Sequence, residues 1–247
     1  MRKRSLIFKI VILVILVGFL AYRVSALSPR FNNYFKRAFS GWEQAEVQDM
    51  IEDFNEIKTT ETTTPPPITY LNVPFICQAP LETEENWIFH EESCEEAATL
   101  MAYIYETKGI ITKEEANEEI LKMIDWQIEN FGKHTDIYAE QVKEFITGYY
   151  ELPAYSVKVI YDASIKDIKK EISAGHPVIV PITGEILRNP HYPHPGYHML
   201  VAIGYTEEKI ITNDNGTRKG DDYSYDTKIF KAAMEDAGGD VLVINID

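Results

Sequence analysis

Apolar residues recur along the chain with two different spacings, and each spacing predicts a different kind of element. Helical spacing, with capping residues and terminal glycines, predicts helices over residues 94–107, 113–131, 136–147, 164–175 and 225–237. Runs rich in β-branched and aromatic residues predict strands over residues 68–76, 155–161, 177–182, 197–205, 209–214 and 241–246. Helices dominate the first half of this region and strands the second. This order predicts the α+β class and disfavours a doubly wound nucleotide-binding sheet.

The N-terminus carries an apolar segment of another kind. An apolar run from Leu6 to Tyr22, interrupted by Lys9, is 17 residues long, and Arg2, Lys3 and Arg4 precede it. This length is at the short end of what spans a bilayer, and the preceding charges place the N-terminus in the cytoplasm. Residues 1–26 are therefore predicted to be a single transmembrane anchor, with the rest of the chain extracytoplasmic. A cleaved signal peptide, which would make the protein secreted, and a buried core helix remain the alternatives.

The next segment does not have the pattern of a packed domain. Residues 41–58 have the spacing of a short acidic amphipathic helix, and residues 59–67 read TTETTTPPP. A Thr- and Pro-rich stretch favours an extended, semi-rigid linker. Residues 27–67 are therefore predicted to be a stalk, and residues 68–247 a single compact domain of ordinary size.

Charge and cysteine content narrow the classes of function. The formal net charge is −15, and because residues 1–40 carry eight Lys and Arg and no Asp or Glu, the remainder has 16 basic against 39 acidic residues. Such an acidic body repels phosphate backbones, so nucleic acid is not an expected partner. The two cysteines are too few for a disulfide scaffold and do not form a CxxC pair, so a structural zinc site is not expected either.

Three residue types suited to nucleophilic catalysis fall at favourable places. Ser93 and Glu96 predict a capping box, which puts Cys94 in the first turn of a helix, where the helix dipole favours a thiolate. His198 starts one predicted strand and Asp214 ends the next, so antiparallel pairing would bring them together. A thiol, an imidazole and a carboxylate in this order can activate a nucleophile, and the amide of Gln78 can donate to an oxyanion.

The domain resembles the bacteriocin-leader-type (double-glycine) cysteine peptidases, which have the papain-like fold. The matching segments are LNVPFICQAP (71–80), ESCEEAATLMAYIY (92–105) after Trp87, GHPVIVPI (175–182), GYHMLVAIGY (196–205) and ITNDNG (211–216). By this resemblance Cys94 is the nucleophile, His198 the general base, Asp214 the orienting residue and Gln78 the oxyanion donor. It also implies cleavage of peptide or amide bonds in a peptide or protein substrate, with neither a metal nor another cofactor.

The sequence departs from this family next to the cysteine. The family usually has glycines on both sides of the cysteine, whereas here Ser93 precedes Cys94, and Glu95 and Glu96 follow it. Two carboxylates in the first turn would raise the pKa of the thiol and offset the benefit of the helix dipole. This departure favours a rival interpretation, in which the domain is an inactive peptidase-like binding module.

The residues of the predicted site also permit different chemistry. They would support acyl transfer if an amine replaced water, and a Cys77–Cys94 disulfide would remove the nucleophile. His191, His194 and His198 lie close together, but prolines interrupt the segment, so a metal site is not expected. Residues 184–196 are instead a candidate specificity loop, and the acidic surface would favour basic or neutral peptides. The sequence does not specify the physiological substrate or the oligomeric state.

Overall fold

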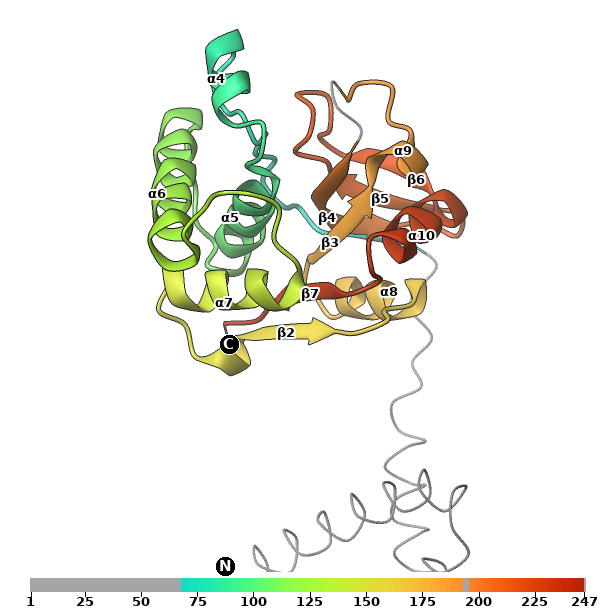
Figure 1. Cartoon of the computed structure of the whole chain (residues 1–247). Coiled ribbons are helices and arrows are strands. Elements are labelled where there is room, and N and C mark those ends of the chain that lie inside the picture. The colour runs from blue at the N-terminus through green and yellow to red at the C-terminus, as the bar shows by residue number, and fades with distance from the viewer. Residues whose placement is uncertain (1–67, 193–195, 247) are drawn as a thin grey trace, which may run out of the picture. The chain divides into compact units, whose positions relative to one another are not determined.

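The computed structural model describes residues 68–192 and 196–246 (Figure 1). The predicted anchor over residues 1–26 and the predicted stalk over residues 27–67 lie outside this range, as does His194. Within the described residues, every helix is too short or too polar to cross a bilayer.

Four helices form the first half of the domain and lie together on the left of Figure 1. They are α4 (Glu84–Phe89), α5 (Cys94–Glu106), α6 (Lys113–Phe131) and α7 (Ala139–Tyr149). The predicted bounds of α6 are confirmed. They could be predicted because residues next to each end determine where the helix starts and stops. Thr112 and Glu115 form a capping box at its start, and Gly132 ends it in the left-handed conformation, with a φ of 77°.

A seven-stranded antiparallel sheet forms most of the second half. Its order is β2-β7-β3-β4-β5-β6, with β1 also paired to β4. The strands are β1 (Thr69–Tyr70), β2 (Val157–Ile160), β3 (Val178–Thr183), β4 (Tyr197–Tyr205), β5 (Lys209–Asn213), β6 (Tyr223–Asp226) and β7 (Val241–Ile244). The helical elements of this half are η1 (Ala154–Ser156), α8 (Ile165–Ser173), α9 (Gly184–Leu187) and α10 (Thr227–Asp236). This arrangement confirms the α+β class.

The core lies where α5 packs against the sheet. Ala97, Ala98 and Ala102 on α5 are fully buried, and their small side chains let the helix lie close to β4. Strand β4 is buried along nearly its whole length, which explains its continuous apolar sequence. The start of α5, which carries Cys94, is thereby fixed against the strand that carries His198.

Several sequence predictions about element bounds are wrong, and the helix predicted over 136–147, for example, begins at Ala139. The predicted strand over residues 68–76 is reduced to the two residues of β1, and the chain then continues without regular pairing. The predicted helix over 225–237 begins instead at Thr227, because Tyr223–Asp226 pair with β5 as strand β6 and the side chain of Asp226 caps the helix. Pairing with a neighbouring strand thus overrides the local helical pattern.

Candidate active site

The three predicted catalytic side chains come from three separate elements. Cys94 is the first residue of α5, His198 is the second residue of β4, and Asp214 follows β5 directly. Cys94 and His198 both line a cavity of about 160 Å³. The other lining residues are Gln78, Trp87, Glu91, Glu92, Asp136, Tyr192, Gly196, Tyr197 and Gly216.

The predicted contact between histidine and aspartate is present. Nε2 of His198 lies 3.0 Å from Oδ1 of Asp214, and both side chains are buried. The contact forms because β4 and β5 are antiparallel neighbours joined by a tight turn, in which the Thr206 N–H donates to the Lys209 carbonyl at 2.9 Å. Since the Asp214 carboxylate can only accept, Nε2 is the nitrogen that carries a proton, and Nδ1 has a free lone pair in the neutral form of the ring.

Asp214 is held by five donors. Oδ1 accepts from His198 and from the backbone N–H of Gly216, at 3.2 Å. Oδ2 accepts from Asn189 at 3.0 Å, from the Tyr192 hydroxyl at 2.7 Å and from the Tyr225 hydroxyl. Burial alone would raise the pKa of this carboxyl, but the hydrogen bonds from His198, Tyr225 and Tyr192 and the charge of His198 hold the pKa below its usual value. The carboxylate is therefore ionised and fixed in direction.

Two glycines make room for this carboxylate and its histidine. A Cβ on Gly220 would lie 1.8 Å from the Asp214 carbonyl oxygen, which the backbone cannot accommodate without moving. A Cβ on Gly216 would lie 2.8 Å from Cε1 of the His198 ring. Gly220 therefore lets the loop after β5 fold back against the Asp214 backbone, and Gly216 lets the same loop approach the His198 ring.

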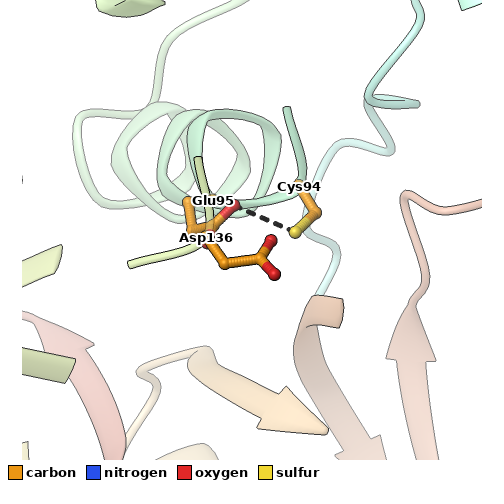
Figure 2. Close-up of side chains that lie close together, drawn as sticks. All are labelled: Cys94, Glu95 and Asp136. Atoms are coloured by element: carbon orange, nitrogen blue, oxygen red, sulfur yellow. Dashed lines mark hydrogen bonds between the residues drawn. The ribbon is translucent and has the colours of Figure 1, made fainter. Parts of the chain in front are cut away.

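Cys94 is buried and its thiol bonds to the neighbouring carboxylate. Figure 2 shows the thiol directed to Glu95, to which Sγ donates at 3.0 Å, with the carboxylate of Asp136 beside the pair. Burial, and then the charge and hydrogen bond of Glu95, raise the pKa of the Cys94 thiol well above its usual value. The direction predicted from the two following glutamates is confirmed. The backbone carbonyl of Cys94 accepts from Asn215 at 2.9 Å, which ties the start of α5 to the loop that carries Asp214.

The predicted capping box at the start of α5 is wrong. Ser93 makes no side-chain cap, and its hydroxyl lies 3.2 Å from Nδ1 of His90 instead. Glu96 points away from the cap, because its Oε1 accepts from the Gln127 side chain and lies 3.2 Å from Nε2 of His134. Tertiary partners of the buried Glu96 thus replace the local bond that the sequence pattern predicts.

Gln78 lies at the cavity as predicted, but its amide is engaged. Nε2 donates to the carbonyls of His90 at 2.9 Å and Glu91 at 2.8 Å. The backbone N–H of Gln78 donates to the Asn215 carbonyl at 3.0 Å, so the residue also links the first loop to the Asp214 loop. In this arrangement Gln78 supports the cavity wall, and donation to an oxyanion would require it to release one carbonyl.

Cys77 and Cys94 are both free thiols, so no disulfide joins them. Cys77 is buried and donates to the Asn215 carbonyl at 3.4 Å. Among the described residues, the ligand atoms of Cys94, Glu95 and Asp136 lie within 4.8 Å of one another, a set that includes none of the histidines from the 184–196 segment.

Several site residues were not identified from the sequence. Asp136 and Glu92 line the cavity, and Tyr192, Tyr225 and Asn189 bind Asp214. Tyr192 and Asn189 belong to the predicted specificity loop, so the structure gives part of that loop a supporting role at the aspartate. The many polar and aromatic residues of that loop are the sequence feature from which Asn189 and Tyr192 could have been predicted. No feature of residues 132–138 indicated that Asp136 would reach the site.

The helical half and the antiparallel sheet, which meet at a cavity with a cysteine and a histidine–aspartate pair, define a C39-like peptidase fold. The chain belongs to the Peptidase_C39 like family, which matches it over residues 70–240. Among solved structures, a protein from Bacillus anthracis assigned as a C39-like peptidase is similar, with a TM-score of 0.52 and 18% sequence identity. The similarity covers 74% of this chain and 99% of that protein, and at this identity it shows the fold alone. No curated protein matches the chain.

Proposed function

We propose that this protein is a cysteine peptidase that hydrolyses peptide or amide bonds with Cys94, His198 and Asp214. The observation that carries the proposal is the 3.0 Å contact between His198 and the ionised Asp214 at the cavity that Cys94 also lines. Asp214 fixes the tautomer of His198, which leaves Nδ1 as the proton acceptor. These are the roles that a thiol nucleophile needs from its base and orienting residue.

The proposed reaction has two stages. His198 Nδ1 takes the proton of the Cys94 thiol, and the thiolate attacks the carbonyl carbon of the scissile bond. Collapse of the tetrahedral intermediate breaks the C–N bond, and His198 returns the proton to the leaving amine. Water, deprotonated by His198, then attacks the thioester and releases the acid and the thiol. The N-terminus of α5, which is the positive end of the helix dipole, carries Cys94 and would stabilise the negative charge that develops on the carbonyl oxygen.

We further propose that the peptidase domain is tethered to the cell membrane and lies on its extracytoplasmic side. The support is the apolar run from Leu6 to Tyr22 and the basic residues that precede it. The competing possibility is secretion after cleavage of the same segment as a signal peptide.

A second candidate function is a peptidase-like binding module without catalysis. The hydrogen bond from the Cys94 thiol to Glu95 favours this candidate, because it stabilises the protonated thiol. The two candidates differ in whether His198 controls the reactivity of Cys94.

Alkylation of the full-length chain in detergent micelles separates the two candidates. We expect iodoacetamide at neutral pH to modify Cys94, and His198→Ala to slow this modification by about tenfold or more, because one pKa unit of the thiol corresponds to a tenfold change in thiolate. Peptide mapping by mass spectrometry measures the rate at each cysteine, and buried Cys77 provides the internal control. Equal rates at Cys94 in both proteins would support the binding module.

We propose that the substrate carries a basic side chain near the scissile bond. Glu92 and Asp136 line the cavity beside Cys94, and no Lys or Arg is among the lining residues that the structure describes. Burial, and then the charge and hydrogen bond of Glu92, raise the pKa of Asp136 to about 6, which reflects two carboxyl groups in close proximity. A cationic side chain would relieve this repulsion.

Asp136→Asn is expected to reduce this selectivity. In matched peptides that differ by Lys against Gln at one position, we expect the wild-type ratio of kcat/KM to fall about tenfold or more in the variant, since a hydrogen bond to a charged group contributes roughly 1.5–3 kcal/mol. The wild-type preference should strengthen as pH rises through about 6, because Asp136 then becomes charged. A preference unchanged in the variant would refute this role of Asp136.

A further inference from the structure

Glu95 is the carboxylate in direct contact with the proposed nucleophile. Its Oε2 accepts from the Cys94 thiol at 3.0 Å, and its Oε1 accepts from the backbone N–H of Ile137 at 2.9 Å. The side chain is buried, so water does not compete for either oxygen. Both oxygens are therefore engaged by the protein, and the carboxylate is fixed where it can act on the sulfur (Figure 2).

The same contacts connect Glu95 to the rest of the site. Ile137 follows Asp136, which lines the cavity, and the Ile137 carbonyl accepts from the Tyr197 hydroxyl at 3.0 Å. Tyr197 precedes His198 in β4. Glu95 thus bonds the nucleophile on one side and, through Ile137, the strand that carries the base on the other.

The charge of Glu95 decides which state of the thiol is favoured. The titratable groups that face it are Cys94 and Glu96 in α5, Asp136 in the adjoining loop and Tyr197 in β4. Burial and then the charge of Glu96 raise the pKa of Glu95 to about 8, against the opposing hydrogen bonds from Cys94 and Ile137. An ionised Glu95 accepts a hydrogen bond from the protonated thiol and repels a thiolate, whereas an uncharged group at this place does not repel a thiolate.

We propose that Glu95 is a positioning residue that controls the reactivity of Cys94. The ionised carboxylate holds the thiol as a hydrogen-bond donor, and loss of this negative charge frees the thiol to transfer its proton to His198. The inference rests on the proposed peptidase function and adds to it a local control of the nucleophile, supplied by the residue that follows it in the chain.

The test is Glu95→Gln in the full-length chain. The amide oxygen can still accept from Ile137, while the amide nitrogen would donate toward the sulfur and favour the thiolate. We expect the rate of Cys94 alkylation at pH 8 to rise about tenfold or more, the effect of one unit in the pKa of the thiol. The ratio of the variant rate to the wild-type rate should grow from pH 7 to pH 9, because wild-type Glu95 becomes charged across this range. A ratio that stays near one with the fold intact would overturn the proposal.

Asp136→Asn is the comparison variant, and we expect it to raise the alkylation rate less than Glu95→Gln does. A carboxylate oxygen of Asp136 lies within 4.8 Å of the Cys94 sulfur, but the described residues show no hydrogen bond between the two, and the charge of Asp136 raises the pKa of the thiol less than the charge and hydrogen bond of Glu95 do. If loss of any nearby charge had the same effect as Glu95→Gln, the specific role of Glu95 would be disproved. Thermal unfolding checks the fold of each variant. If Glu95→Gln does not fold, the pH dependence of Cys94 alkylation in the wild-type protein still tests the proposal. A plot of the logarithm of this rate against pH should have a slope below one from pH 7 to pH 9, and a slope of one would contradict the proposal.

Combining Glu95→Gln with His198→Ala distinguishes this inference from the proposed function. An increase in rate that His198→Ala abolishes supports both. An increase that persists without His198, together with no effect of His198→Ala alone, supports the control by Glu95 and overturns proton transfer to that histidine, and with it the peptidase mechanism. Labelling that depends on His198 but not on Glu95 refutes only the control by Glu95.

Discussion

Cys94→Ala is expected to abolish peptide cleavage by the full-length chain, with a loss of about a thousandfold or more. The variant keeps the His198–Asp214 contact and removes only the sulfur that would form the thioester. Since Cys94 starts α5 without a side-chain cap from Ser93, alanine should also preserve the helix. The measurement is hydrolysis of a mixed peptide library, followed by mass spectrometry.

Cys77→Ala is the matched control for this loss. Cys77 is also a buried free thiol, but it donates to the Asn215 carbonyl and lines a different pocket, with Phe75 and Lys113. We expect the Cys77→Ala variant to cleave the same peptides within a few-fold of the wild-type rate, because a buried cysteine behaves as a small apolar residue. Cleavage that survives in Cys94→Ala, or disappears in Cys77→Ala, would assign the chemistry to a different residue.

The contact between His198 and Asp214 could be predicted because it depends on local information. The apolar run of β4, the tight turn after Tyr205 and the run of β5 are each visible in the sequence, and antiparallel pairing then fixes which residues meet. The segments that carry Cys94, His198 and Asp214, in this order, also indicated the resemblance to a known family. Contacts that depend on strand pairing and on the order of residues in the chain could therefore be predicted from the sequence.

The environment of the cysteine could not be predicted in the same way. Asp136 reaches the cavity from a loop between α6 and α7, and Ile137 binds Glu95 across 42 positions of the chain. Tyr225 binds Asp214 only because residues 223–226 pair with β5, where the local pattern predicted a helix. Each of these contacts depends on tertiary packing, for which a single sequence carries no periodic signal.

The two glutamates after Cys94 have a structural role as well as an electrostatic one. Glu95 binds the backbone of Ile137, and Glu96 contacts Gln127 and His134, so both connect α5 to the end of α6 and the loop after it. Burial opposes the charged form of His134, but the Glu96 carboxylate, whose Oε1 lies 3.2 Å from Nε2, outweighs it and raises the pKa of His134. The residues that make the thiol less acidic thus also hold the cavity wall that carries Asp136.

Asp214→Ala is expected to destabilise the domain by about 3–5 kcal/mol at neutral pH, the range for loss of one partner from a buried charged network. Five donors would lose their acceptor, among them the hydroxyls of Tyr192 and Tyr225 and the ring of His198. Asp214→Asn should cost less, because its remaining oxygen still accepts from His198. Urea unfolding of the full-length chain, monitored by tryptophan fluorescence, measures the difference.

The pH dependence of this loss identifies its cause. Because the folded pKa of Asp214 is lowered, its contribution to stability is complete above the unfolded pKa of about 3.9 and decreases as pH falls toward the folded value. The difference between wild type and Asp214→Ala should therefore narrow below about pH 4. Asp125→Ala, at an exposed position of α6, is the control and should change stability by less than about 0.5 kcal/mol. If the free energy of unfolding of Asp214→Ala lies within about 1 kcal/mol of the wild-type value, the five hydrogen bonds to the carboxylate do not stabilise the fold. The ionised carboxylate would then have a role in catalysis alone.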